Sequence, residues 1–326
     1  MSQRKIAKVQ EKNKSSNFFV RYGLLILVVF LFILFSLLQP SFITVPNIFG
    51  ILRQASILGL LALGLTLIVI VGEFDISFVA ISVFSGVIPV ILIMHGVENI
   101  PLIWTIGITL GVGLSLINAI SIVYIGIPSF IATLAMMMAL TGAARGFTGG
   151  YEIFPSAFPP GFGLLGKYLI IGLIPVQIFI FIAAATVLTL FLDYSPLGRY
   201  IYAVGGNPDA STHVGINIKK VKFFVFFVAG LLYGIAGVVM SSMFGSANSS
   251  MGDGYLLPGI IVCFLGAIFL TEGVHNPRGT IVSVILMSIL SNGFTMVNMP
   301  FYGKAITQGA ILLIALIIVI TIRKKQ

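Results

Sequence analysis

The chain has 326 residues, of which 58% are hydrophobic and 8% are charged, and it carries a formal net charge of +9. A soluble domain has about 25% charged residues, so this composition excludes an ordinary soluble protein and indicates an integral membrane protein. The basic residues fall between apolar runs, as they do in the loops of membrane proteins. We therefore expect the protein to lie in membrane lipid, and we do not expect its positive charge to bind nucleic acid.

The first 21 residues are polar, and an apolar run over 22–38 follows them. After this run comes Gln39-Pro40-Ser41-Phe42, which has no small-x-small cleavage pattern of a signal peptide. We therefore expect 1–21 to be a cytoplasmic tail and 22–38 to be a retained membrane helix.

Ten apolar runs have about the length that crosses a bilayer, which is roughly 20 residues. The predicted spans are 22–38, 55–71, 77–94, 102–124, 129–145, 170–191, 223–243, 255–272, 279–297 and 303–322. The predicted fold is thus an all-α polytopic membrane protein with about ten transmembrane helices over 22–322 and a short tail over 323–326.

The distribution of Lys and Arg predicts the orientation, because positively charged loops stay in the cytoplasm. With the N-terminus inside, 14 of the 18 Lys and Arg residues fall on the cytoplasmic side. The outer side keeps Arg53, Arg145, Lys167 and Lys304. We therefore expect both termini to be cytoplasmic.

Two carboxylates lie between the second and third runs, in Gly72-Glu73-Phe74-Asp75-Ile76-Ser77. Ionisable groups at membrane depth are costly and usually face a cavity or a partner, and transporters often bind polar ligands at broken helices. Glu73, Asp75 and Ser77 are therefore candidates for lining a substrate path. The alternative is a cytoplasmic turn between two spans, which the span count favours.

The segment Gly161-x-x-x-x-Gly166-Lys167 has most of a phosphate-binding loop, but Tyr168 follows where Ser or Thr would hold magnesium. It also lies in a predicted outer loop with no strand before it. We expect no cofactor on this chain, and the scattered histidines His95, His213 and His275 lack the spacing of metal ligands.

The loop 192–222 contains the signals of a short capped helix. Asn207 is a favourable N-cap, Pro208 suits the first helical position, and Asp209 complements the helix dipole. Gly215 can end the helix in a left-handed conformation. Such a helix is too short to be stable alone, so it is either a packed connector or a contact point for a partner.

The string Asp209-Ala210-Ser211-x-x-x-Gly215 resembles the cytoplasmic coupling motif of ABC importer permeases. The wider string from Gly198-Arg199 to Gly215-Ile216-Asn217 resembles the ribose/xylose/galactoside branch of these permeases. Three further stretches resemble that branch in the same order. They are Gly72-Glu73-Phe74-Asp75-Ile76-Ser77, Pro128-Ser129-Phe130-Ile131-Ala132-Thr133-Leu134 and Pro277-Arg278-Gly279-Thr280.

The resemblance implies a non-enzymatic pore subunit in a bacterial cytoplasmic membrane. It implies an ATPase subunit that carries ATP and magnesium, an extracytoplasmic sugar-binding protein, and a second permease copy or sister permease. The residues that would contact the ATPase are Asn207, Pro208, Asp209, Ala210, Ser211, Gly215 and Ile216.

The implied substrate is a pentose or hexose, and a furanose-like signalling molecule or a nucleoside is an alternative. Asn118, Asn248, Ser249 and Asp253 join the candidates for the sugar path, because sugar hydroxyls pair with amides and carboxylates. Asn248 and Asp253 would equally suit contacts with the binding protein, and packing or solvation would explain each of the four. An ion-coupled secondary transporter is the remaining alternative, but most spans lack the carboxylates that ion coupling uses.

Overall fold

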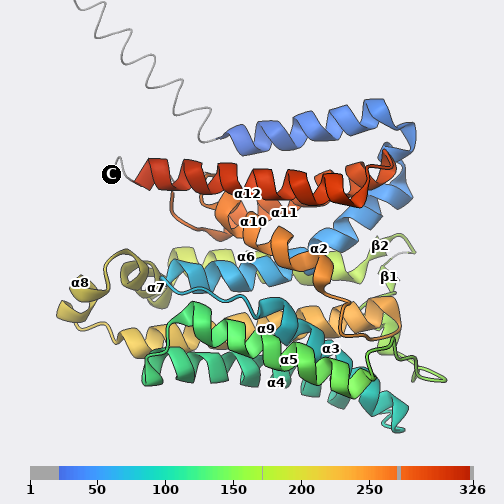
Figure 1. The fold of residues 1–326 in the computed structure, drawn as a ribbon, viewed down its shortest axis with the longest axis horizontal. Coiled ribbons are helices and arrows are strands. Elements are labelled where there is room, and N and C mark those ends of the chain that lie inside the picture. The colour runs from blue at the N-terminus through green and yellow to red at the C-terminus, as the bar shows by residue number, and fades with distance from the viewer. Residues whose placement is uncertain (1–21, 171, 270–272, 324–326) are drawn as a thin grey trace, which may run out of the picture. The chain divides into compact units, whose positions relative to one another are not determined.

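The computed structural model describes residues 22–170, 172–269 and 273–323, and the expected tails lie largely outside them. Most of these residues form helices, and one small hairpin and several irregular connections complete the structure (Figure 1). Six helices are long and apolar enough to cross a membrane: 45–70, 100–125, 129–148, 176–194, 218–244 and 277–296. Shorter apolar helices occupy Tyr22–Leu38, Phe78–Met94, Asp253–Gly266 and Phe301–Ile317.

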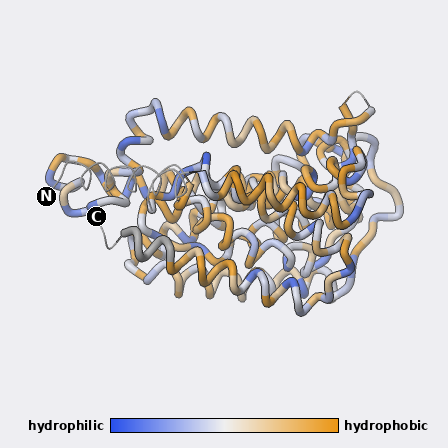
Figure 2. The backbone as a smooth tube through the Cα atoms, turned by 90° about the horizontal axis from the view of Figure 1, so that it is seen from above, coloured by the Kyte–Doolittle hydropathy of each residue, from blue (hydrophilic) through white to orange (hydrophobic). Residues whose placement is uncertain are grey.

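Each predicted span overlaps one of these apolar helices, which confirms the all-α membrane fold. Figure 2 shows that the helices are hydrophobic along most of their length, while hydrophilic residues gather in the connections. That ten helices span the membrane stays a prediction.

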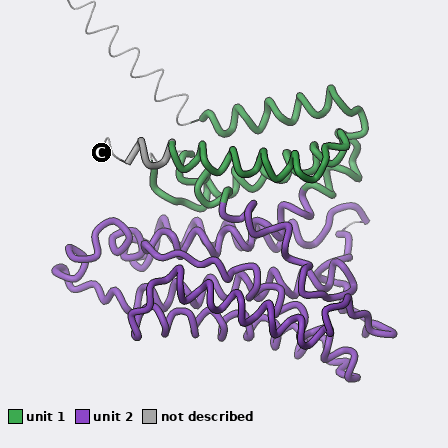
Figure 3. The backbone as a smooth tube through the Cα atoms, in the orientation of Figure 1, with its two compact units in different colours: residues 1–51, 261–326 green, residues 52–260 purple. Residues whose placement is uncertain are grey.

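The chain divides into two compact units, residues 1–51 with 261–326 and residues 52–260 (Figure 3). The division falls inside α2 (Val45–Ile70) and α10 (Leu256–Gly266). The second unit contains α3 (Phe78–Met94), α4 (Ile100–Ala119), α5 (Ser129–Thr148), α6 (Val176–Tyr194) and α9 (Ile218–Phe244).

Helix α9 packs against α3 and α4 through glycines. A Cβ atom added to Gly111 of α4 would lie 2.6 Å from the Cα atom of Gly234 and 2.7 Å from the carbonyl oxygen of Gly230. A Cβ atom on Gly237 would lie 2.1 Å from the carbonyl oxygen of Ser82 in α3. The glycines thus allow the backbones to approach closely, as small residues do in membrane helices.

Residues 71–77 form a non-helical connection between α2 and α3, which we call the α2–α3 link. The peptide N–H groups of Gly72 and Glu73 bond to the carbonyl oxygens of Val69 (3.1 Å) and Ile68 (3.1 Å), and Gly72 has φ +83°. These bonds end α2 in a Schellman motif, which needs a left-handed residue at this position. The link then continues in a non-helical conformation to the first residue of α3.

Two connections lie at opposite ends of the second unit (Figure 1). One contains α7 (Pro196–Gly206) and α8 (Pro208–His213). The other contains the 3-10 turn η3 (Phe162–Leu164) and an antiparallel hairpin of β1 (Leu169–Ile170) and β2 (Ile174–Pro175).

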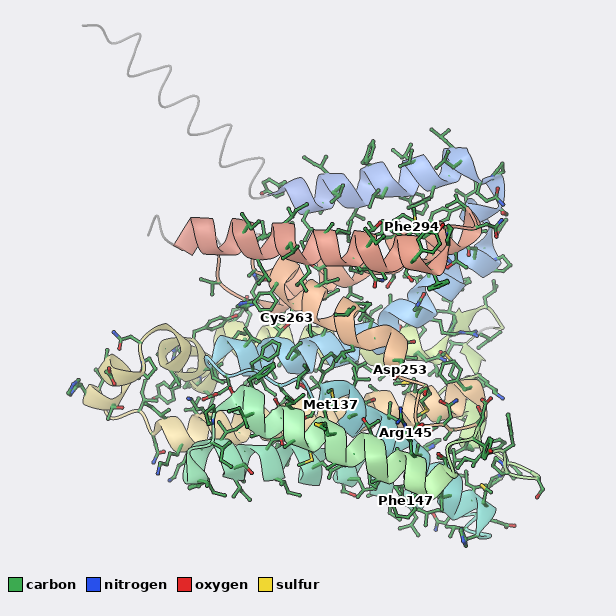
Figure 4. The ribbon with its side chains drawn as sticks, in the orientation of Figure 1. Met137, Arg145, Phe147, Asp253, Cys263 and Phe294 are labelled. Atoms are coloured by element: carbon green, nitrogen blue, oxygen red, sulfur yellow. The ribbon has the colours of Figure 1, made fainter. Side chains whose placement is uncertain are left out.

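The first unit contains α11 (Pro277–Met296), α12 (Phe301–Arg323) and the 3-10 turn η1 (Pro40–Ile43). The ring of Phe35 lies 5.6 Å from that of Phe42 and 5.9 Å from that of Phe294, centroid to centroid (Figure 4). The side chains of Asn47 and Asn292 pair at 3.1 and 3.0 Å. Cys263, the single cysteine of the sequence, is fully buried.

Three predicted boundaries are wrong. Helix α2 begins at Val45, ten residues before the predicted start, so Arg53 lies inside a helix rather than in an outer loop. Helix α10 ends at Gly266 instead of continuing to 272, and α6 begins at Val176 because β2 occupies the preceding residues. Hydrophobicity alone cannot separate a helix from an apolar strand or turn of the same composition.

Candidate functional site

A cavity of about 300 Å³ lies among α3, α5 and the start of α10, entirely within the second unit. Figure 4 labels Met137 of α5 and Asp253, which line it from two sides. The lining residues are Val79, Ala80, Val83, Met137, Leu140, Thr141, Ser249, Asp253, Leu256 and Leu257.

The cavity combines an apolar wall with a few polar groups. Aliphatic side chains and Met137 make up most of the surface, while Thr141, Ser249 and Asp253 supply two hydroxyls and a carboxylate. Small-molecule sites have this character, and their volumes begin at about 300 Å³. The arrangement can bind a small molecule that presents hydroxyl groups, because a carboxylate accepts their hydrogen bonds and serine and threonine both donate and accept.

Two of the candidate path residues, Ser249 and Asp253, thus lie in the wall of this cavity. Thr141, Leu140 and Met137 were not singled out from the sequence. A threonine within an apolar helix is the one available signal, but such threonines usually bond to their own helix. Thr141 does so as well, donating to the carbonyl oxygen of Met137 at 2.8 Å.

Asp75, Ser77 and Asn118 come together in a second place, where all three are buried. Asp75 Oδ1 accepts from the backbone N–H and the hydroxyl of Ser77, at 2.8 and 2.5 Å. The Asn118 side-chain amide donates to Ser77 Oγ at 2.9 Å. The cluster ties the α2–α3 link to α4, and its three residues are not part of the cavity wall.

Glu73 faces the basic end of the 192–222 loop instead of the cavity. Its Oε1 lies 2.5 Å from the Nζ atom of Lys222, near the start of α9, and the two side chains are 14% and 19% exposed. Asn248 closes a local turn, since its Oδ1 accepts from the N–H of Ser250 at 2.8 Å.

Helix α8 has the caps that the sequence predicts. Asn207 Oδ1 accepts from the N–H of Ala210 at 2.9 Å, Pro208 is the first helical residue, and Gly215 has φ +82°. Ser211 is buried and donates to the carbonyl oxygen of Asn207 at 2.8 Å. A rigid capped turn is therefore formed.

The outer surface of α8 is open. Asp209 and Ala210 are exposed, and Val214, just after the helix, has 75% of its surface exposed. A short helix with an exposed aliphatic side chain at its end is accessible to a protein partner.

Helix α7 was not predicted, although the chain offers its cap. Ser195 Oγ accepts from the N–H of Gly198 at 2.9 Å, and Pro196 occupies the first helical position. The apparent phosphate-binding loop serves packing instead: a Cβ atom on Gly166 would lie 2.1 Å from the backbone nitrogen of Met243.

Apolar helices, six of them long enough to cross a membrane, define a polytopic membrane protein. Residues 47–320 match the family described as "Branched-chain amino acid transport system / permease component". The chain belongs to this family of transport permeases.

Similar proteins cover most of the chain. It is 32% identical to the ribose import permease protein RbsC of Bacillus subtilis, over 91% of this chain and 90% of that one. It is 31% identical to the L-arabinose ABC transporter permease protein AraH of Azospirillum brasilense, over 91% and 86%. It is 30% identical to the autoinducer 2 import system permease protein LsrD of Photorhabdus temperata, over 91% of each.

Among solved structures, an inward-facing putative metal-chelate type ABC transporter shares the fold. Its TM-score is 0.51 at 13% sequence identity, over 85% of this chain and 89% of that one.

Proposed function

We propose that this chain is the membrane-spanning permease subunit of an ATP-driven, binding-protein-dependent importer for a monosaccharide. The observation that carries the proposal is the alignment with a ribose import permease over nine-tenths of both chains. The proposed partners are an ATPase subunit that holds ATP and magnesium, an extracytoplasmic sugar-binding protein, and a second permease copy or sister permease.

The cavity supports a polar substrate of sugar size. Asp253, Thr141 and Ser249 would hydrogen-bond hydroxyl groups, and Met137 with Leu140 would contact the C–H surfaces of a sugar ring. Sugar recognition needs both kinds of contact, because a pyranose or furanose has a hydroxyl rim and apolar faces. A purely apolar cavity would instead suit an aliphatic side chain.

The proposed topology has ten spans over 22–322, with α8 and both termini in the cytoplasm of a bacterial inner membrane. Two observations support it. The α7–α8 connection and the hairpin connection lie at opposite ends of the second unit (Figure 1). Arg199 of α7 and three lysines in the first turns of α9, Lys219, Lys220 and Lys222, belong to the α7–α8 end. Positive residues of short loops stay on the cytoplasmic side.

In this orientation, α8 is the contact point for the ATPase. The residues proposed for this contact are Asn207, Pro208, Asp209, Ala210, Ser211, Gly215 and Ile216. Those that are exposed would touch the ATPase directly, while buried Ser211 would hold the turn in shape.

A second candidate substrate is the autoinducer 2 class of small furanose-like signalling molecules, which the similarity to LsrD favours. The cavity does not discriminate between this class and a pentose, since both present several hydroxyls on a small ring.

An uptake assay tests the proposal. The chain is expressed with its ATPase and binding protein in cells lacking their own importers for these compounds, and labelled ribose, arabinose, xylose, autoinducer 2 and leucine are supplied separately. We expect ATP-dependent uptake of one of the sugars or of autoinducer 2. The control is an ATPase variant with its phosphate-binding lysine replaced. Uptake of leucine alone, or sugar uptake that persists with the disabled ATPase, would refute the assignment.

A further inference from the structure

We propose that the Glu73–Lys222 ion pair transmits movement of the α7–α8 connection through the α2–α3 link to the walls of the cavity. The proposal rests on the proposed function and adds to it two positioning residues, which touch no substrate. It follows from how the link is attached at each of its two sides.

On one side, the link is held by the elements that flank α8. Lys222, four residues into α9, pairs with Glu73 at 2.5 Å. Near the end of α7, Gly205 lies directly against the end of α2, where an added Cβ atom would come 1.6 Å from the carbonyl oxygen of Ile70. Because α8 lies between α7 and α9 in the chain and contacts both, a push on α8 reaches the link at two points.

On the other side, the link is bonded to α5. The N–H of Phe74 donates to Ser129 Oγ and the N–H of Ile76 donates to Thr133 Oγ1, each at 3.2 Å. Thr133 lies one helical turn before Met137, which lines the cavity. The α5 wall of the cavity is therefore attached to the link.

The link also leads directly into the α3 wall. Ser77 is its last residue, and Val79 and Ala80 in the first turn of α3 line the cavity. Asp75 and Asn118 clamp Ser77 by hydrogen bonds, so the link cannot slide freely past α4. A displacement of Glu73 is thus passed to α3 and α5 instead of being absorbed in a flexible loop.

The charges are suited to this role. Both side chains are largely buried, and an ion pair with little exposure is held more strongly than one on the surface because water screens it less. Removing or reversing one charge leaves the other without its partner in a partly desolvated place, which is strongly unfavourable. The pair can therefore transmit both a pull and a push.

The test is a charge exchange in the complete transport complex, reconstituted in lipid vesicles with its ATPase and binding protein. Uptake of the substrate and ATP hydrolysis are measured on the same vesicles for Glu73→Lys, Lys222→Glu and the double exchange. We expect each single variant to lower uptake by about tenfold or more while ATP hydrolysis continues, because like charges replace an ion pair. The double exchange should restore about half of the uptake or more, since opposite charges face each other again.

The matched control is Glu98→Lys, which reverses an exposed carboxylate in the α3–α4 connection and should leave the ratio of ATP hydrolysed to substrate transported unchanged. If a single variant does not accumulate in the membrane, Glu73→Gln replaces it. In that variant the ratio of ATP hydrolysed to substrate transported should rise about threefold above the wild-type ratio, because a neutral amide pairs more weakly with Lys222.

Three results would overturn the proposal: single variants that transport as the wild type does, single variants that lose ATP hydrolysis together with uptake, or a double exchange that restores nothing. A wild-type complex that takes up none of the substrates would instead count against the proposed function.

Discussion

The close packing of α4 against α9 leads to a prediction about two glycines of the same helix. Gly111 and Gly113 both lie in α4, two residues apart. A Cβ atom on Gly111 would lie 2.6 Å from both the Cα and the nitrogen of Gly234, and backbone atoms cannot rotate out of the way. A Cβ atom on Gly113 meets nothing within 4 Å. We expect Gly111→Ala to destabilise the protein and Gly113→Ala not to.

The magnitude follows from comparing the two variants. Each replaces glycine by alanine in the same helix, so the gain in helix propensity, about 1 kcal/mol, is common to both. The difference is the overpacking at α9, which costs about 1–3 kcal/mol. Gly111→Ala should therefore be less stable than Gly113→Ala by about 1–3 kcal/mol, a value that does not depend on the propensity scale.

The assay is unfolding of the purified chain by a denaturing detergent titrated into a mild one, followed by circular dichroism and by size-exclusion chromatography. Gly111→Ala is expected to unfold at a lower fraction of denaturing detergent than Gly113→Ala. Equal stability of the two variants would show that α4 and α9 are not in close contact in the membrane-extracted protein, and the reasoning from the glycine contacts would fail.

Three further predictions concern the proposed transport function and its support. Asp209→Arg or Gly215→Pro should abolish uptake while membrane insertion persists. The first variant removes the acidic residue from the surface of α8, and the second prevents the left-handed conformation that ends the helix. Normal uptake by both variants would exclude α8 as the contact point for the ATPase. Asp253→Asn should lower uptake at low substrate concentration by about tenfold, since a hydrogen bond to a charged acceptor is stronger than one to a neutral acceptor. The control variant Glu98→Gln should leave uptake unchanged. Equal uptake by the two variants would exclude Asp253 from the substrate path. Asn118→Ala should lower the stability by about 1 kcal/mol, the usual scale of an interhelical hydrogen bond in a membrane protein, and an unchanged detergent midpoint would contradict this.

The acidic segment joins α2 to α3, and both of its carboxylates have protein partners. Glu73 faces Lys222, and Asp75 accepts from Ser77, which in turn accepts from Asn118. Neither carboxylate lines the cavity. We propose that the segment connects the cavity with the basic loop. The carboxylate in the cavity wall comes from Asp253, in another part of the chain.

Local chemistry was enough to predict the membrane class, the positions of the apolar helices and the caps of α8. Each depends on residues that are neighbours in the sequence: about twenty apolar residues in a row for a helix, and Asn207, Pro208 and Gly215 for a capped turn. The same rules apply to α7, whose N-terminus has a serine cap at Ser195 followed by Pro196.

Only the tertiary structure could decide which polar groups meet. Glu73 and Lys222 are 149 positions apart, and the cavity takes its walls from α3, α5 and the start of α10. In a bundle where nearly every helix is apolar on all sides, hydrophobicity does not say which face is buried or which helix is its neighbour. Those choices are made by the close approach of backbones at glycines such as Gly111 and Gly237, and by a few buried hydrogen bonds.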